Sequence, residues 1–286
     1  RIFTDEPMKK HTTFRVGGPA DILVQPKGTE LAAVIRLCRK YDVPYQVIGN
    51  GSNLLVGDRG IRGLVIEMLS KEDEICVEDD CITVGAGMLL SKTANRAAEH
   101  GLTGMEFAAG IPGSIGGAVV MNAGAYGGEM KDILTAVTVL DQEGNEKIFS
   151  AEELELGYRT SCILKKGYIV MGAKIKLKHG EETAIRARME ELKKQRVEKQ
   201  PLEYPSAGST FKRPEGYFAG KLIMDAGLRG YLVGEAQVSE KHCGFVINRG
   251  NATAADVRTL MQNVADIVEE KFGVRLEPEV KMIGEF

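Results

Sequence analysis

The sequence predicts an α+β protein built from several modules, not a doubly wound parallel sheet. Three observations carry this prediction. A β-α-β unit occupies residues 20–48, strands without intervening helices fill residues 137–178, and long helical patterns cover residues 181–199 and 254–272. Regular alternation of strands and helices would instead predict a parallel sheet covered by helices on both faces.

The N-terminal β-α-β unit is defined by breakers and by apolar spacing. A strand over residues 20–25 ends at Pro26, and Thr29 is expected to cap the following helix. A second strand covers residues 45–48, and a third, residues 64–68, follows a glycine-rich loop. The helix is indicated by apolar residues at helical spacing: Leu31, Val34, Ile35 and Cys38.

The middle of the chain is rich in strands. Residues 75–84 alternate in polarity around an acidic turn, and a short helix over residues 91–100 is expected to end at Gly101. Residues 137–140 and 146–149 flank a turn sequence and predict a hairpin. Another strand is expected at residues 168–178.

The last third contains two long helices and a final strand. The charged pattern of residues 181–199 predicts a solvated helix that Pro201 stops. Thr253 and Asp256 predict a capping box at the start of the second helix, which Gly273 ends. A strand at residues 279–283 follows.

Composition excludes several classes of protein. The net charge of −3 provides no basic surplus for nucleic acid, and no apolar run is long enough to span a membrane. The five cysteines include no C-x-x-C pair, which favours a reducing compartment over a disulfide framework or a zinc site. The N-terminal residues lack the apolar core of a signal peptide. We therefore expect a cytoplasmic protein with no metal and no membrane association.

A glycine loop follows the strand at residues 45–48. Small residues there allow backbone N–H groups to converge on an anion, and the candidates are Gly49, Asn50, Gly51, Ser52 and Asn53. The spacing matches neither G-x-G-x-x-G nor a P-loop.

A second glycine-dense segment, residues 110–127, also contains apolar residues that would hold it in the interior. It indicates close backbone approach to a flat, bulky group, or else tight packing between elements without a ligand. Two such loops in one chain favour a nucleotide-type cofactor. The candidate residues are Gly110, Pro112, Gly113, Ser114, Gly116, Gly117, Asn122, Gly124 and Ala125.

Taken together, ordered motifs resemble one family. They are residues 11–20, 47–58, 110–127, 158–161, 207–214 and 277–280, and the resemblance covers nearly the whole chain. The family is UDP-N-acetylenolpyruvoylglucosamine reductase, in the short subtype that lacks an inserted tyrosine-bearing loop.

The resemblance implies an FAD-binding fold of the vanillyl-alcohol-oxidase type, in two subdomains, with an α+β substrate-binding domain. The implied boundaries are residues 1–68 for subdomain 1, 69–180 for subdomain 2 and 181–278 for the substrate domain. Residues 279–286 are expected to return to subdomain 1. The first loop would hold the pyrophosphate of non-covalent FAD, and the second would line the flavin. NADPH would reduce the flavin, whose N5 would then pass hydride to the enolpyruvyl group.

Three residues are implied to be catalytic. Arg159, which would also contact the cofactor, and Glu279 would stabilise the negative charge that develops on the substrate, Glu279 as a protonated hydrogen-bond donor. Ser209 would supply the proton. Each has an ordinary alternative, respectively a surface arginine, a solvent-facing strand residue and a turn serine. Glu277 lies two residues from Glu279 and is the carboxylate to exclude.

Substrate contacts are expected from residues around these three. They are Tyr158, Lys199, Gln200, Lys212, Arg213 and Lys281. Lys281 stands where relatives often carry arginine, and Ala207 stands where many carry cysteine. We expect a monomer. The rival functions are a flavin oxidase of the same superfamily and a non-catalytic nucleotide-sugar binding protein.

Overall fold

The computed structural model describes residues 1–68 and 75–286, which form two compact units. Unit 1 comprises Arg1–Ile2, Val24–Asn50 and Leu64–Arg196. Unit 2 comprises Phe3–Leu23, Gly51–Gly63 and Val197–Phe286. The chain passes between the units five times, so each contains segments that are distant in sequence. The division into two subdomains and a substrate domain stays a prediction.

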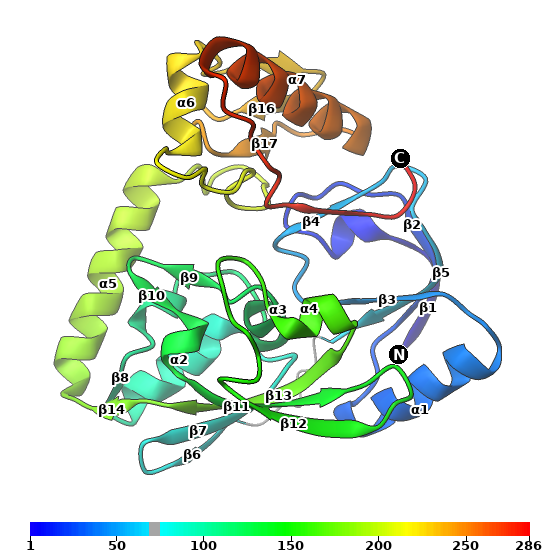
Figure 1. Cartoon of the computed structure of the whole chain (residues 1–286), viewed down its shortest axis with the longest axis vertical. Helices are drawn as coiled ribbons and strands as arrows, with labels where there is room; N and C mark the ends of the chain where they lie inside the picture. Colours follow the sequence, from blue (N-terminus) through cyan, green and yellow to red (C-terminus); the bar gives the residue numbers. More distant parts are fainter. Residues whose placement is uncertain (69–74) are drawn as a thin grey trace. The chain divides into compact units, whose positions relative to one another are not determined.

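A five-stranded antiparallel sheet forms the centre of unit 1 (Figure 1). Its strand order is β12-β11-β13-β7-β6. The bounds are Glu146–Ser150 for β12, Leu134–Leu140 for β11, Ile169–Lys176 for β13, Cys81–Gly85 for β7 and Ile75–Glu78 for β6. The hairpin predicted within residues 137–149 is confirmed, and Val137 pairs with Phe149. An antiparallel sheet of this kind confirms the α+β class.

Helix α1 (Gly28–Lys40) packs beside β3 (Tyr45–Ile48), which pairs in parallel with residues 64–67 of β5 (Ile61–Glu67). The apolar spacing predicted for α1 is confirmed at Leu31, Ile35 and Cys38, which are buried. The predicted Thr29 cap is wrong. The carboxylate of Glu30 accepts a hydrogen bond from the Lys27 amide at 2.8 Å, so the helix begins before Thr29.

The rest of unit 1 consists of short elements and one long helix. These are α2 (Leu90–Glu99), β8 (Leu102–Thr103), η2 (Glu106–Ala108), α3 (Ile115–Val120), β9 (Gly124–Ala125), β10 (Gly128–Glu129), η3 (Met130–Asp132), α4 (Cys162–Lys166), β14 (Lys178–His179) and α5 (Glu182–Lys199). Gly101 adopts φ +64° after α2, as expected for a residue that ends a helix. Helix α5 begins in unit 1, and its last three residues belong to unit 2.

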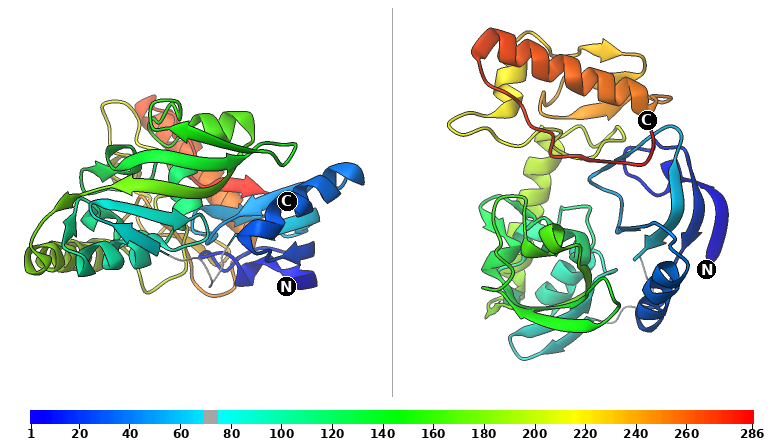
Figure 2. Two further views of the ribbon diagram at one scale, coloured as in Figure 1. Left: turned by 90° about the horizontal axis from the view of Figure 1, so that it is seen from below. Right: turned by 45° about the vertical axis from the view of Figure 1, so that its right-hand side comes forward.

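Unit 2 is organised around helix α7 (Ala254–Phe272), which packs against three short strands (Figure 2). The predicted capping box is confirmed, since the Asp256 amide donates to Thr253 Oγ1 at 3.0 Å and the Thr253 amide donates to Asp256 Oδ2 at 3.0 Å. The apolar residues that the helix buries include Val257, Leu260, Met261, Val264 and Val268. The strands are β15 (Leu232–Val233), β16 (Ala236–Val238) and β17 (Val246–Asn248).

The remaining elements of unit 2 come from both ends of the chain. They are β1 (Ile2–Pro7), η1 (Met8–Lys10), β2 (Pro19–Val24), β4 (Leu54–Val56), α6 (Ala219–Asp225) and β18 (Lys281–Ile283). Strand β18 pairs in parallel with β4, with Lys281 opposite Leu54. None of the helices in residues 1–68 and 75–286 combines the length and the apolar character that a membrane span requires.

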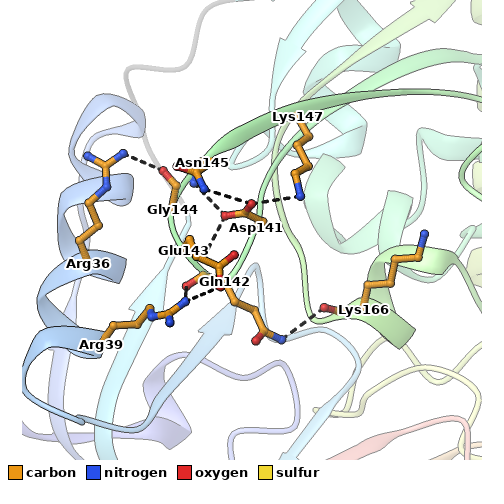
Figure 3. Close-up of polar contacts among 9 residues, drawn as sticks. All are labelled: Arg36, Arg39, Asp141, Gln142, Glu143, Gly144, Asn145, Lys147 and Lys166. Atoms are coloured by element: carbon orange, nitrogen blue, oxygen red, sulfur yellow. Dashed lines mark hydrogen bonds and ion pairs between the residues drawn. The ribbon is translucent and has the colours of Figure 1, made fainter.

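The turn between β11 and β12 docks onto α1 through polar contacts (Figure 3). Arg36 donates to the Gly144 carbonyl at 3.0 Å, and Arg39 bonds Glu143 at 2.6 Å. Inside the turn, the buried Asp141 carboxylate accepts from the Asn145 and Glu143 amides at 2.9 Å and pairs with Lys147. The backbone hydrogen bond from Asn145 is the largest of several causes that lower the pKa of Asp141 to about 2.

This pKa predicts a pH-dependent contribution of Asp141 to stability. The pKa of this carboxyl group is lower in the folded state than its ordinary value of 3.8. Its ionised form therefore stabilises the folded state fully above pH 3.8, and this stabilisation is lost as the pH falls toward about 2. We expect Asp141→Asn to lower the midpoint of urea unfolding at pH 7, and the difference from the parent protein to shrink below pH 3.8.

Glu143→Gln is the matched control, because its carboxylate lies in the same turn and makes an exposed ion pair. Its effect at pH 7 should be clearly smaller. A deficit for Asp141→Asn that is unchanged in acid would contradict the role of the ionised carboxylate.

Candidate active site

Residues Gly49 and Asn50 of the first glycine loop meet the second glycine-dense segment within unit 1. Asn50 donates from Nδ2 to the Pro112 carbonyl at 2.6 Å. A Cβ atom on Gly49 would lie 2.2 Å from Ser114 Oγ, so any larger residue would displace Ser114. The structure therefore brings together candidate residues that are more than 60 positions apart in the sequence.

The second segment contains a short helix, which the glycine content concealed. Ser114 is the N-cap of α3, and its Oγ accepts from the Gly117 amide at 3.4 Å. Two of its glycines are explained by protein packing. A Cβ atom added to Gly116 would lie 3.1 Å from the Cβ of Ala86, and one added to Gly124 would lie 2.7 Å from the Cβ of Glu129. The packing explanation thus accounts for part of the segment.

Arg196, near the end of α5, lies against the same segment. A Cβ atom on Gly110 would lie 3.1 Å from Arg196 Nη1, so the guanidinium passes closely over the Gly110 backbone. Burial lowers the pKa of Arg196, and Tyr126 partly offsets this effect. Within the described residues, Arg196 Nε is buried and has no hydrogen-bond partner. A buried cationic donor left unsatisfied fits a ligand that supplies a hydrogen-bond acceptor or negative charge.

Sequence reasoning missed Arg196, because the charges of residues 181–199 predicted a solvated face. Most of them do lie at the surface, as in the Arg188–Glu191 pair at 2.6 Å. The sequence feature that could have identified Arg196 is its position on the apolar side of the helix, not its charge. Ile185 and Leu192 are buried, and Met189 packs against the hydrophobic core of unit 1. Arg196 falls four residues after Leu192 on this apolar stripe.

Arg159 stands in a tight turn between Gly157 and Thr160. The two ends of the turn exchange backbone hydrogen bonds of 3.1 and 3.3 Å, and Arg159 adopts φ +55°, which is uncommon for a non-glycine residue. Its guanidinium lies 5.0 Å from the centre of the Tyr158 ring and 3.5 Å from the Gly124 carbonyl oxygen. Ala125 adjoins Gly124 in β9. Unit 1 therefore holds Tyr158 and Arg159 beside the second segment.

The remaining part of the first loop belongs to unit 2, where it contacts the C-terminal strand. Asn53 donates from Nδ2 to the Glu279 carbonyl at 3.1 Å, and its own carbonyl accepts from the Lys281 amide at 2.9 Å. Gly51 has φ +59°, and a Cβ there would lie 2.0 Å from the His11 carbonyl oxygen. Ser52, between them, is partly exposed.

Ser209 is exposed, but the backbone around it is fixed by buried Thr210. The Thr210 amide donates to the Gly244 carbonyl at 2.9 Å, and its Oγ1 accepts from the Val246 amide at 2.9 Å. Its carbonyl accepts from the Glu279 amide at 2.8 Å. The structure therefore brings the backbones of Ser209 and Glu279 together in unit 2.

The predicted substrate residues around Ser209 have different environments. Lys212 pairs with Glu277 at 3.0 Å, and this hydrogen bond lowers the pKa of Glu277. Arg213 stacks on Phe218, with its guanidinium 4.0 Å from the ring centre. Lys199 is exposed and Gln200 partly buried. Glu277 is thus engaged by Lys212 at the surface.

The structure groups the predicted residues into two sets. Unit 1 contains Gly49, Asn50, the second segment and Arg159, and unit 2 contains Gly51–Asn53, Ser209 and Glu279. Among the described residues, no cluster of histidine, cysteine and carboxylate side chains is suited to hold a metal ion. The catalytic and binding roles of all these residues are proposals.

Two family models match the chain. Residues 20–150 match a model described as an FAD binding domain. Residues 200–283 match the C-terminal domain of UDP-N-acetylenolpyruvoylglucosamine reductase. The first match covers both glycine loops, and the second covers Ser209 and Glu279. The predicted α+β FAD-binding fold is thereby confirmed.

Relatives match over nearly the whole length. The chain is 60% identical to UDP-N-acetylenolpyruvoylglucosamine reductase of Agathobacter rectalis, covering 100% of this chain and 95% of the relative. The chain is 58% identical to the enzyme of that name from Lachnoclostridium phytofermentans, covering 100% of this chain and 94% of the relative. A crystal structure of the Thermus caldophilus reductase has a TM-score of 0.83 at 40% identity and covers 99% and 98%. The chain belongs to the UDP-N-acetylenolpyruvoylglucosamine reductase family.

Proposed function

We propose that this protein uses FAD and NADPH to reduce the enolpyruvyl group of UDP-N-acetylenolpyruvoylglucosamine, yielding UDP-N-acetylmuramate for peptidoglycan precursor synthesis. It is an oxidoreductase. Family membership over the whole chain supports the reaction. The structural observation that supports this reaction is the hydrogen bond from the Glu279 amide to the Thr210 carbonyl. This bond holds the segments of Ser209 and Glu279 next to each other.

The residues present fit FAD. Arg196 offers a buried, unsatisfied N–H beside the backbone of Gly110. We propose that FAD is held without a covalent bond by the two glycine-containing segments and Arg196. When bound, FAD would accept hydride from NADPH and transfer it to the double bond of the substrate.

Three side chains would serve the reduction itself. Hydride addition to an enolpyruvyl group moves negative charge toward its carboxylate, and the guanidinium of Arg159 would stabilise that charge while remaining ionised. The carboxyl group of Glu279 would donate a hydrogen bond to the same charge. Ser209 would give its hydroxyl proton to the neighbouring carbon, since it is exposed on a backbone that Thr210 fixes.

The proposed substrate residues are polar or basic and accessible. Tyr158, Lys199, Gln200, Lys212, Arg213 and Lys281 would bind the diphosphate and sugar groups. All five cysteines are free, as is usual in a reducing compartment, so the proposed location is the cytoplasm. We propose that the protein acts as a monomer.

Anaerobic stopped-flow absorbance of the FAD-loaded protein tests the function. NADPH should bleach the flavin, and UDP-N-acetylenolpyruvoylglucosamine should restore its colour. A protein that does not take up FAD would instead support the binding-protein alternative. Rapid restoration by oxygen but not by the sugar nucleotide would support the oxidase alternative.

Ser209→Ala should separate the two half-reactions. We expect flavin reduction by NADPH within about twofold of the parent rate, because Ser209 has no part in that step. Reoxidation by substrate should slow by roughly 10²–10⁴-fold, the usual contribution of a positioned proton donor. Equal losses in both half-reactions would reject the assigned role.

Arg196→Gln should weaken FAD binding by roughly 10- to 100-fold, the equivalent of a charged hydrogen bond of about 1.5–3 kcal/mol. Titration of apoprotein with FAD, followed by flavin fluorescence, measures this affinity. Arg188→Gln is the control, because Arg188 lies on the same helix and pairs with Glu191 at the surface. If the two variants bind FAD equally well, Arg196 does not contact the cofactor.

A further inference from the structure

Asn122 follows the end of α3 and is fully buried, with φ +42°. Its side chain is satisfied by protein alone. Nδ2 donates to Glu129 Oε2 at 2.9 Å and to the Gly157 carbonyl at 3.2 Å, and Oδ1 accepts from the Lys131 amide at 2.9 Å. An asparagine amide has two donor hydrogens, so both are used within the protein. The protein itself thus uses both donor hydrogens of Asn122.

The Gly157 carbonyl links Asn122 to the turn that carries Arg159. This oxygen accepts from Asn122 and also from the Thr160 amide, which closes the turn at 3.3 Å. A second connection lies just after the turn, where Ser161 Oγ donates to the Val120 carbonyl at 2.8 Å. The end of α3 thus holds the turn on both sides of Arg159.

The conformation of Arg159 requires such support. Its positive φ is unfavourable for an arginine and persists only where the surroundings impose it. The hydrogen bonds from Asn122 and Ser161, of 3.2 and 2.8 Å, come from buried residues and hold the backbone on either side of it.

We propose that Asn122 is a positioning residue for Arg159 and sets the direction of its guanidinium toward the substrate carboxylate. This inference rests on the proposed role of Arg159. Asn122 itself does not touch the reacting atoms. It acts through the Gly157 carbonyl, and Glu129, which also pairs with Lys131, fixes the amide from the opposite side.

The test is Asn122→Asp, a change of nearly equal size that removes the two amide hydrogens. The new carboxyl group carries at most one hydrogen, so it cannot donate to both Glu129 and the Gly157 carbonyl. We expect reoxidation of the flavin by substrate to slow on the order of 10- to 100-fold, as small displacements of a catalytic group do. Flavin reduction by NADPH and FAD content should stay within about twofold. Asn95→Asp, at an exposed asparagine of α2, should match the parent protein.

A double-mutant cycle with Arg159→Met identifies the route of the effect. If Asn122 acts through Arg159, adding Asn122→Asp to Arg159→Met should cause no further loss of the reoxidation rate. Additive losses would overturn the inference, and so would a single Asn122→Asp variant with normal reoxidation. A normal reoxidation rate for Arg159→Met alone would instead reject the proposed role of Arg159.

Ser161→Ala carries the test if Asn122→Asp does not accumulate as folded protein. It removes one hydroxyl from the second connection of the turn. Reoxidation should slow by a smaller factor, again without further loss in the Arg159→Met background. Normal reoxidation in Ser161→Ala would then overturn the inference.

Discussion

The hydrogen bond from the Glu279 amide to the Thr210 carbonyl is the constraint on which the proposed catalytic arrangement in unit 2 depends. Phe211 and Pro278 form an antiparallel bridge beside it, and the Lys212 amide donates to the Glu277 carbonyl. Two segments far apart in the sequence therefore run together at fixed register. Because the backbones that carry Ser209 and Glu279 are held at fixed register, they need little reorganisation when substrate binds.

Much of the fold could be predicted from local patterns. The start of α7 followed from Thr253 and Asp256, and the β11–β12 hairpin followed from its turn sequence, because these signals act over a few residues. The start of α1 did not, since the Glu30 side chain reaches back to the Lys27 amide and the helix begins before Thr29. Helix α3 was hidden because glycine is a poor helix former, and only tertiary packing on Ala86 makes Gly116 acceptable there.

The site was predictable where ordered motifs resembled a family and obscure where chemistry depended on burial. Ser209 and Glu279 belong to motifs whose residue types could be read directly, although only the structure brings their backbones together. Arg196 looked like one more charge on a solvated helix, because sequence does not reveal that its Nε is buried. Asn122 was predicted as one of several residues of a cofactor loop. The structure shows that its side chain bonds Glu129 in β10, the backbone amide of Lys131 and the carbonyl of Gly157, which is distant in sequence.

The pairing of β18 with β4 has a consequence for biosynthesis. Asn53 donates to the Glu279 carbonyl, and these two residues are 226 positions apart in the chain. Because ribosomes synthesise about 5–20 residues per second, Glu279 is made more than about ten seconds after Asn53. During that interval the edge of β4 that later receives β18 is available to other extended segments.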